Sequence, residues 1–154
     1  MVLMMFDAHF TEYDEPSGEK IASGECFIFD AKAMSFRHFW NVVKNVSTLR
    51  LYLKYIQEAV PFNIVKVHFV NCSYIVDRLF ALIKPLLSAE LLQVMYFHTQ
   101  GMESLYEHIP RTFLPTELGG ELGPLSEIYK KFVEFVVSKR DYLMNDDNWK
   151  MTDC

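Results

Sequence analysis

The sequence predicts an α/β fold, in which helices connect the strands of one sheet. Two short apolar runs, Glu25–Asp30 and Ile64–Val70, are typical of buried strands. Between them, apolar residues recur at steps of three and four, which is typical of a helix with one buried face. A strand, a helix and a second strand in this order favour a sheet whose strands are joined by crossover helices.

The N-terminal half contains the first predicted strand and helix. We expect Val2–Phe10 to be helical and Thr11–Ser23 to be a loop, before the strand Glu25–Asp30. The helix begins at Val46 and ends before Pro61. Its apolar stripe is Val46, Leu49, Leu53, Ile56 and Val60, while Lys54 and Glu58 form a pair four residues apart on the polar side.

The central region contains a second strand and an unusual helix. Ile64–Val70 is apolar at nearly every position, as in a strand that is covered on both faces. Tyr74–Ile83 is predicted to be a helix that is apolar almost all round, with only Asp77 and Arg78 polar, and Pro85 breaks it. Leu91–Phe97 reads as a helix end followed by a third strand.

One further helix is predicted near the C-terminus. Pro124 stands where this helix begins, and its buried stripe is expected to be Leu125, Ile128, Phe132 and Phe135. Beyond Tyr142 we expect a frayed tail. The sequence has no internal repeat and no boundary of a second domain, so 154 residues predict one domain.

Composition excludes several classes of protein. The net charge of -5 offers no long-range attraction to phosphate, which argues against nucleic-acid binding. The three cysteines, Cys26, Cys72 and Cys154, contain no C-x-x-C pair, so a disulfide framework or a zinc module is not expected and a reducing cytoplasm is the simplest location. No run approaches the ~20 apolar residues of a membrane span.

Known catalytic motifs are absent from the sequence. It has no G-x-S-x-G, no phosphate-binding glycine loop and no H-E-x-x-H, so we predict no catalytic residue, no metal site and no cofactor. Cys72 follows a strand with His68 four residues away, but that spacing is too long for a thiolate pair on an extended chain. We interpret each histidine as structural.

Large apolar side chains are unusually frequent. The chain has 13 Phe, 8 Tyr and 8 Met, which fits either a dense core or an aromatic-lined cavity for an apolar ligand. The helix that is apolar on all sides favours the cavity, because such a helix must be covered on both sides or contact a ligand on one side and a membrane on the other.

Five segments in order resemble one known family. They are Phe27–Asp30 before a helix, Pro61, Val67–Asn71, Ile83–Ser88 and Leu114–Gly120. Together they resemble the CRAL-TRIO lipid-binding domain. The resemblance implies an α/β fold in which a sheet, helices and a mobile gate helix enclose a hydrophobic cavity, within a domain that covers residues 1–142 and leaves 143–154 as a flexible tail.

The resemblance also implies a function. Members of the family bind a small hydrophobic molecule and transfer it between membranes without catalysis, so the expected partner is a tocopherol-, retinoid- or phospholipid-like molecule. The gate would be Tyr74–Leu92, which also makes transient contact with a membrane surface. The ligand-binding residues carried over are Phe27, Phe29, Tyr52, Ile56, Val60, Ile64, Val67, Ile83 and Leu87. Glu25 and Tyr52 are candidate partners of a polar headgroup.

The sequence departs from the family pattern in two ways. In relatives, basic residues bind a phosphoinositide headgroup, but the matching positions here are not basic, which argues against phosphoinositide-dependent release. These positions are Asn63, Val65, Glu90, Leu92 and Val94. The family also carries a helical lobe and a first strand before the point that corresponds to Met1. An alternative is therefore a truncated isoform or fragment that acts only as a protein-interaction module.

Overall fold

The structure, a computed structural model, describes residues 24–60 and 63–149. The expected helix Val2–Phe10, the expected loop Thr11–Ser23 and Pro61 lie outside these residues. The chain divides into two compact units. We call the described residues 24–110 the sheet unit and the described residues 111–149 the C-terminal unit.

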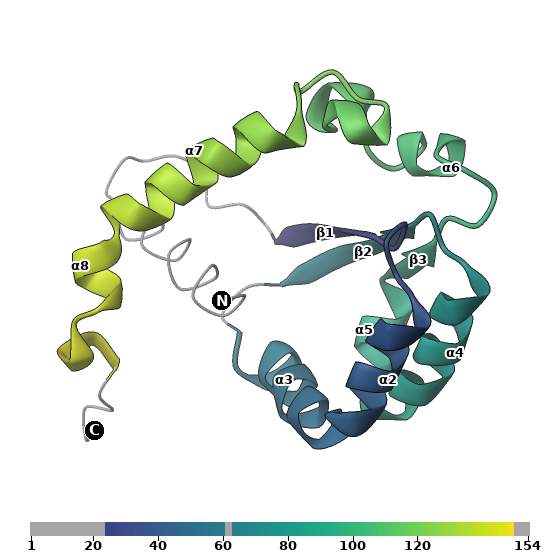
Figure 1. Ribbon diagram of the computed structural model, residues 1–154, viewed down its shortest axis with the longest axis horizontal. Helices are drawn as coiled ribbons and strands as arrows, with labels where there is room; N and C mark the ends of the chain where they lie inside the picture. Colours follow the sequence, from purple (N-terminus) through teal and green to yellow (C-terminus); the bar gives the residue numbers. More distant parts are fainter. Residues whose placement is uncertain (1–23, 61–62, 150–154) are drawn as a thin grey trace. The chain divides into compact units, whose positions relative to one another are not determined.

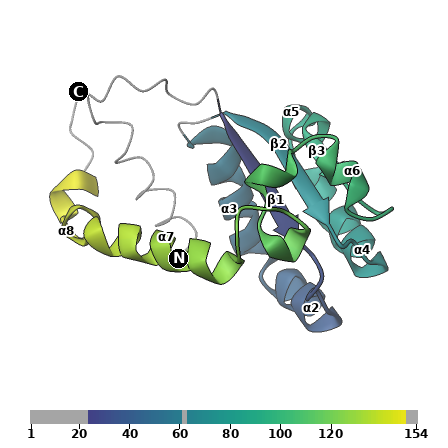
Figure 2. The same cartoon turned by 90° about the horizontal axis from the view of Figure 1, so that it is seen from above.

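The sheet unit is built around three parallel strands. They are β1 (Glu25–Asp30), β2 (Ile64–Val70) and β3 (Met95–Phe97), in the order β1-β2-β3 (Figure 2). The predicted strands Glu25–Asp30 and Ile64–Val70 are therefore confirmed with the same bounds, and the third strand lies within the predicted Leu91–Phe97.

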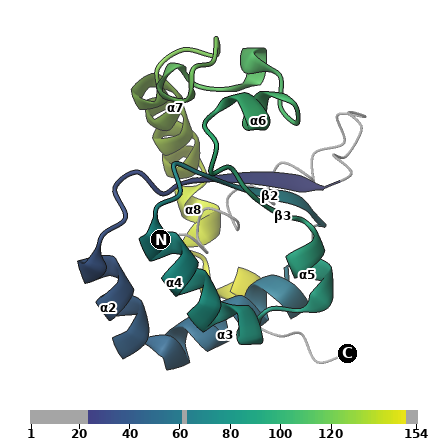
Figure 3. The same ribbon diagram turned by 90° about the vertical axis from the view of Figure 1, so that its right-hand side faces the viewer.

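Helices connect the strands and cover one face of the sheet. Because parallel crossovers share one hand, two crossovers that advance in the same direction place their helices on the same face. Figures 1 and 3 show this arrangement, with α6 (Glu103–Tyr106) on the opposite face. The crossover elements are α2 (Phe36–Lys44), α3 (Val46–Glu58), α4 (Tyr74–Ile83), η1 (Lys84–Leu86) and α5 (Ala89–Gln93).

The C-terminal ends of β1 and β2 are joined by side chains. Asn71, directly after β2, has a φ of 54°, a left-handed conformation that asparagine tolerates better than most residues. Its Nδ2 donates a hydrogen bond to Oδ1 of Asp30 at 2.8 Å, and the same oxygen accepts from the backbone N–H of Lys32 at 2.9 Å. The Val67–Asn71 motif therefore ends β2, and its last residue, Asn71, links the end of β2 to the end of β1.

The core of the sheet unit is centred on β2. Val67, His68 and Val70 are buried, together with Val76 of α4 and Leu105 of α6. Elements on both faces thus pack against the middle strand, which explains its nearly continuous apolar sequence. The predicted pair on the polar side of α3 is also present, with Lys54 Nζ 3.7 Å from a carboxylate oxygen of Glu58.

The C-terminal unit consists of short helical turns and one longer helix. The predicted stripe is wrong at one position: Leu125 is 52% exposed, while Ile128, Phe132 and Phe135 are half-buried. Leu125 lies at the start of the helix, where an apolar residue is not forced inside.

Where we expected a tail beyond Tyr142, helical turns continue to Trp149. The elements are η2 (Arg111–Phe113), η3 (Thr116–Leu118), α7 (Leu125–Ser138), α8 (Arg140–Leu143) and η4 (Asp146–Trp149).

The two glycines of the Leu114–Gly120 motif have separate roles. Gly119 ends η3 with a φ of 74°, which favours glycine. At Gly120 a side chain would collide with the backbone of Leu114. The motif therefore depends on the close approach of the backbone at Gly120 to the backbone at Leu114.

None of the helices within residues 24–60 and 63–149 is both long and apolar enough to cross a bilayer.

Candidate functional site

A layer of stacked phenylalanine rings covers the face of the sheet below the crossover helices. The strand register places Phe29, Phe69 and Phe97 side by side on β1, β2 and β3. The ring centroids of Phe29 and Phe69 are 5.2 Å apart, and those of Phe69 and Phe97 are 4.9 Å apart. Phe27 extends the layer along β1, with its ring 6.5 Å from that of Phe29. We call these four residues the aromatic floor.

The helix α4 lies over this floor. The ring of Phe80 meets that of Phe97 edge-on, with centroids 4.7 Å apart. Along α4, Val76 is buried and Tyr74 is 61% exposed. The segment predicted as a gate thus contacts the sheet with one face and presents an aromatic ring to solvent with another.

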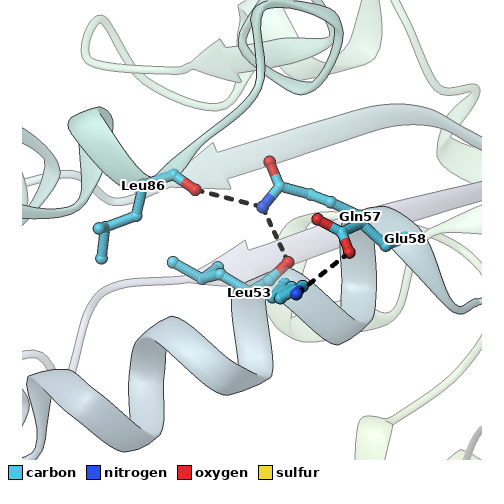
Figure 4. Close-up of polar contacts among 5 residues, drawn as sticks. Leu53, Gln57, Glu58 and Leu86 are labelled. Atoms are coloured by element: carbon cyan, nitrogen blue, oxygen red, sulfur yellow. Dashed lines mark hydrogen bonds and ion pairs between the residues drawn. The ribbon is translucent and has the colours of Figure 1, made fainter.

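Gln57 connects α3 to the C-terminal half of the predicted gate. Its Nε2 donates hydrogen bonds to the backbone oxygens of Leu53 at 2.8 Å and Leu86 at 3.2 Å (Figure 4). Its Oε1 accepts from the backbone N–H of Ser88 at 2.6 Å. Since Ser88 also caps the start of α5 by accepting from the N–H of Leu91, this one side chain orders the junction between η1 and α5.

A pocket of about 470 Å³ lies beside this junction. It is formed by the end of α3, the start of β2 and α5. The described residues that line it are Ile56, Gln57, Val60, Asn63, Ile64, Ser88, Glu90, Leu91, Gln93 and Val94. Its volume is in the range of pockets that hold small molecules.

The nine predicted ligand-binding residues fall into three groups. Ile56, Val60 and Ile64 line the pocket. Phe27 and Phe29 belong to the aromatic floor, and the register places Val67 beside Phe27 on the same face. The structure thus brings the residues of these two groups together, each in its own place, without collecting all nine in one described pocket.

The third group is Tyr52, Ile83 and Leu87, all half-buried. Burial raises the pKa of the Tyr52 hydroxyl, so this group stays protonated and available as a donor at neutral pH. Ile83 ends α4, and Leu87 follows η1. Both lie in the predicted gate.

Three aromatic residues of the site were missed by reasoning from the sequence. They are Phe69, Phe97 and Phe80. Phe69 could have been predicted from the alternation of side chains along a strand, because it lies two residues after Val67 and must share its face. Phe97 and Phe80 required the register of β3 and the placement of α4, which the sequence pattern does not contain.

The opposite face of the sheet carries a chain of hydrogen-bonded histidines. Nδ1 of His68 and Nε2 of His98 are 2.8 Å apart, and Nδ1 of His98 is 2.8 Å from Oγ of Ser104. The Ser104 hydroxyl donates to the backbone oxygen of Gly101 at 3.2 Å, so it accepts from Nδ1–H of His98. His98 Nε2 then accepts from Nδ1–H of His68.

This chain leaves Nε2 of His68 buried with no hydrogen-bond partner among the described residues. The ring is stacked against Tyr96 at 5.2 Å and lies 5.2 Å from the ring of His108. Burial, and then repulsion from His98, His108 and Lys66, lower the pKa of His68 to about 4. His68 is therefore neutral at neutral pH, as expected for a structural histidine.

The structure offers little support for nucleophilic chemistry at Cys72. Its Sγ donates to the backbone oxygen of Phe69 at 3.4 Å, and burial, with the charge of Asp77, raises the thiol pKa. Among the described residues no group of three or more His, Cys, Asp or Glu side chains is arranged to hold a metal ion.

Known proteins share this sequence pattern. A family model described as CRAL/TRIO domain matches residues 1–120. Clavesin-1 of Rattus norvegicus is 31% identical over 102 residues, which make up 66% of this chain and 28% of that protein. Alpha-tocopherol transfer protein-like of Homo sapiens is 37% identical over 70 residues, 46% of this chain and 20% of that protein. Clavesin-2 of Mus musculus is 28% identical over 102 residues, with 66% of this chain and 31% of that protein covered. The matched region thus spans less than a third of the length of these relatives.

Proposed function

The chain belongs to the CRAL/TRIO domain family, and on this basis we propose that it binds a small hydrophobic ligand and transfers it between membranes without catalysis. The ligand class is tocopherol-, retinoid- or phospholipid-like. The name of one relative, alpha-tocopherol transfer protein-like, supports this class. The observation that carries the proposal is the aromatic floor, because stacked rings on one sheet face form a broad apolar surface.

The aromatic floor supplies the affinity. Each Å² of apolar surface that leaves water contributes ~25 cal/mol, so an isoprenoid-sized ligand laid on Phe29, Phe69 and Phe97 needs no covalent step to be held. Phe29 is 51% exposed, which leaves part of this surface available.

The gate, Tyr74–Leu92, controls access to the floor. In this structure Phe80 rests on Phe97, so a ligand that occupies the same part of the floor has to displace α4. The hydrogen bonds of Gln57 to Leu86 and Ser88 hold the far end of the gate. An α4 that moves about a fixed η1–α5 junction fits a lid that opens without unfolding.

An exposed aromatic patch provides the membrane contact. It consists of Phe36 and Trp40 on α2 and Tyr74 on α4, which are 55%, 56% and 61% exposed, and the rings of Phe36 and Tyr74 are 5.8 Å apart. Aromatic rings of this kind favour the bilayer interface. Since α2 carries Arg37 and Lys44 and no acidic residue, the patch suits an anionic membrane surface. We infer a cytoplasmic protein that associates with membranes transiently.

The test is native mass spectrometry of the purified chain, followed by solvent extraction and identification of any bound lipid. The proposal predicts one lipid per chain and exchange of that lipid with vesicles. A chain that retains no lipid and takes up no tocopherol, retinoid or phospholipid probe would contradict it. Such a chain, if it bound a protein partner through the exposed aromatic patch, would instead support the interaction module.

A further inference from the structure

The pocket between α3, β2 and α5 has a mixed lining. Its described lining residues include apolar side chains, such as those of Ile56, Val60 and Leu91. They also include the polar side chains of Asn63, Glu90 and Gln93. A pocket of about 470 Å³ with this mixture suits the polar end of an amphiphile together with the first part of its chain.

Three of the polar side chains are available to a ligand. Gln57 is engaged with Leu53, Leu86 and Ser88. By contrast, the side chains of Asn63, Glu90 and Gln93 form no hydrogen bond or ion pair with any other described residue, and all three residues are exposed. Each presents an oxygen acceptor, and the unused acceptors come from two places around one pocket: Asn63 directly before β2, and Glu90 and Gln93 on α5.

The charge of the pocket determines which ligand it accepts. Among the described residues that line the pocket, Glu90 is the only charged one, and none is Lys, Arg or His. On α3, the ammonium group of Lys54 is already paired with the carboxylate of Glu58. The negative charge of Glu90, which no cationic side chain among the described lining residues offsets, disfavours a phosphate and favours a cation.

The geometry of the lining distinguishes between two kinds of cation. A quaternary ammonium is usually held by aromatic faces, and none of the described residues that line the pocket is aromatic. A primary ammonium instead carries three N–H donors, which match the acceptor oxygens of Glu90, Asn63 and Gln93. We propose that this pocket binds the primary ammonium head of an amphiphilic ligand, a proposal that rests on the proposed lipid-binding function for the amphiphile itself.

The experiment titrates the purified full chain with ethanolamine and follows backbone amide resonances by NMR at constant ionic strength. Saturable shifts are expected for residues 88–94 and for Asn63. We expect the Glu90→Gln and Glu90→Ala variants to weaken the binding of ethanolamine at least fivefold. Glu127→Gln, which removes an exposed carboxylate from the first turn of α7, serves as the matched control and should leave the titration unchanged.

Two further probes decide the chemistry. Choline should bind at least fivefold more weakly than ethanolamine, and inorganic phosphate should cause no saturable shift at these residues. The proposal is overturned if phosphate or choline binds as well as ethanolamine, if ethanolamine does not bind, or if neither variant at Glu90 weakens it. The same preparation is extracted for lipid: ethanolamine binding without retained lipid contradicts the proposed function alone, whereas retained lipid without ethanolamine binding contradicts this inference alone.

Discussion

The side chain of Gln57 accepts a hydrogen bond from the backbone N–H of Ser88 at 2.6 Å, across 31 positions of sequence. The same side chain donates to the backbone oxygen of Leu86 at 3.2 Å. One amide therefore satisfies two backbone groups at the break between η1 and α5, where neither helix can satisfy them. This contact fixes one end of the gate to α3.

Replacing Gln57 should loosen the gate. In Gln57→Leu the N–H of Ser88 and the oxygen of Leu86 lose their partner, so we expect faster hydrogen exchange at Ser88 and a loss of about 1–3 kcal/mol of unfolding free energy. Hydrogen exchange and urea unfolding measure the two effects. The neighbouring Glu58→Gln removes an exposed ion pair and should change stability by less than about 0.5 kcal/mol. Unchanged exchange at Ser88 would show that the junction is ordered by other contacts.

Phe69 should be important for ligand retention because it is the central ring of the aromatic floor. Phe69→Leu keeps an apolar side chain but removes stacking with both Phe29 and Phe97. We expect the unfolding free energy to fall by about 1–2 kcal/mol, which leaves the chain folded, and the amount of lipid bound per folded chain to fall as well. Phe113→Leu is the control, since Phe113 is 70% exposed. Equal lipid retention in both variants would indicate that the floor is ordinary core.

The exposed aromatic patch should govern membrane binding. The double variant Phe36→Ser and Trp40→Ser removes two exposed rings, so we expect several-fold weaker flotation with anionic vesicles and little change in unfolding. Phe113→Ser removes a ring that is even more exposed, at 70%, but lies outside the patch, and it should leave flotation unchanged. A similar loss in the control would mean that general surface hydrophobicity drives the binding.

Stability should fall as the pH is lowered because of His68. Its pKa is about 4 when folded and close to 6.5 when unfolded, so below pH 6.5 the unfolded chain binds a proton that the folded chain does not. The neutral ring's contribution is present above pH 6.5 and is lost between pH 6.5 and 4, with a slope of at most about 1.4 kcal/mol per pH unit.

Denaturant unfolding at several pH values measures this slope. His68→Phe keeps a ring in the stack with Tyr96 and removes the titrating group, so its slope should be smaller over the same range. If the wild type and the variant have the same slope, His68 is not the group responsible.

Glu117 should stabilise the start of α7. Both of its carboxylate oxygens accept from the backbone N–H of Leu125, at 2.8 and 3.0 Å, and this bond lowers the carboxyl pKa below 4.5. The contribution is therefore present above pH 4.5 and is lost as the pH falls below it. In Glu117→Gln the first turn of α7 should fray at neutral pH, which amide exchange at Leu125 reports. Glu121→Gln is the matched control, and equal exchange in both variants would exclude a capping role.

Much of the architecture of the sheet unit was predictable because its elements are defined locally. Gly24 and Asp30 bound β1, the apolar run Ile64–Val70 defines β2, and the break at Pro85 separates α4 from α5. Burial was less predictable. Leu125 belongs to an apolar stripe and is nevertheless 52% exposed. The periodicity of a helix shows which residues share a face, but it does not show which other element packs against each of them.

By itself, the sequence determined the strands β1, β2 and β3, the helices α3, α4 and α7, the family and the absence of basic residues at Asn63, Glu90 and Val94. Only the tertiary structure decided that Phe80 rests on Phe97, that Gln57 holds Ser88 and that His68 shares a hydrogen bond with His98. The physical reason is range. Secondary structure follows from contacts within a few residues, whereas these pairs are 17, 31 and 30 positions apart and meet only when parallel strands and their crossovers have paired.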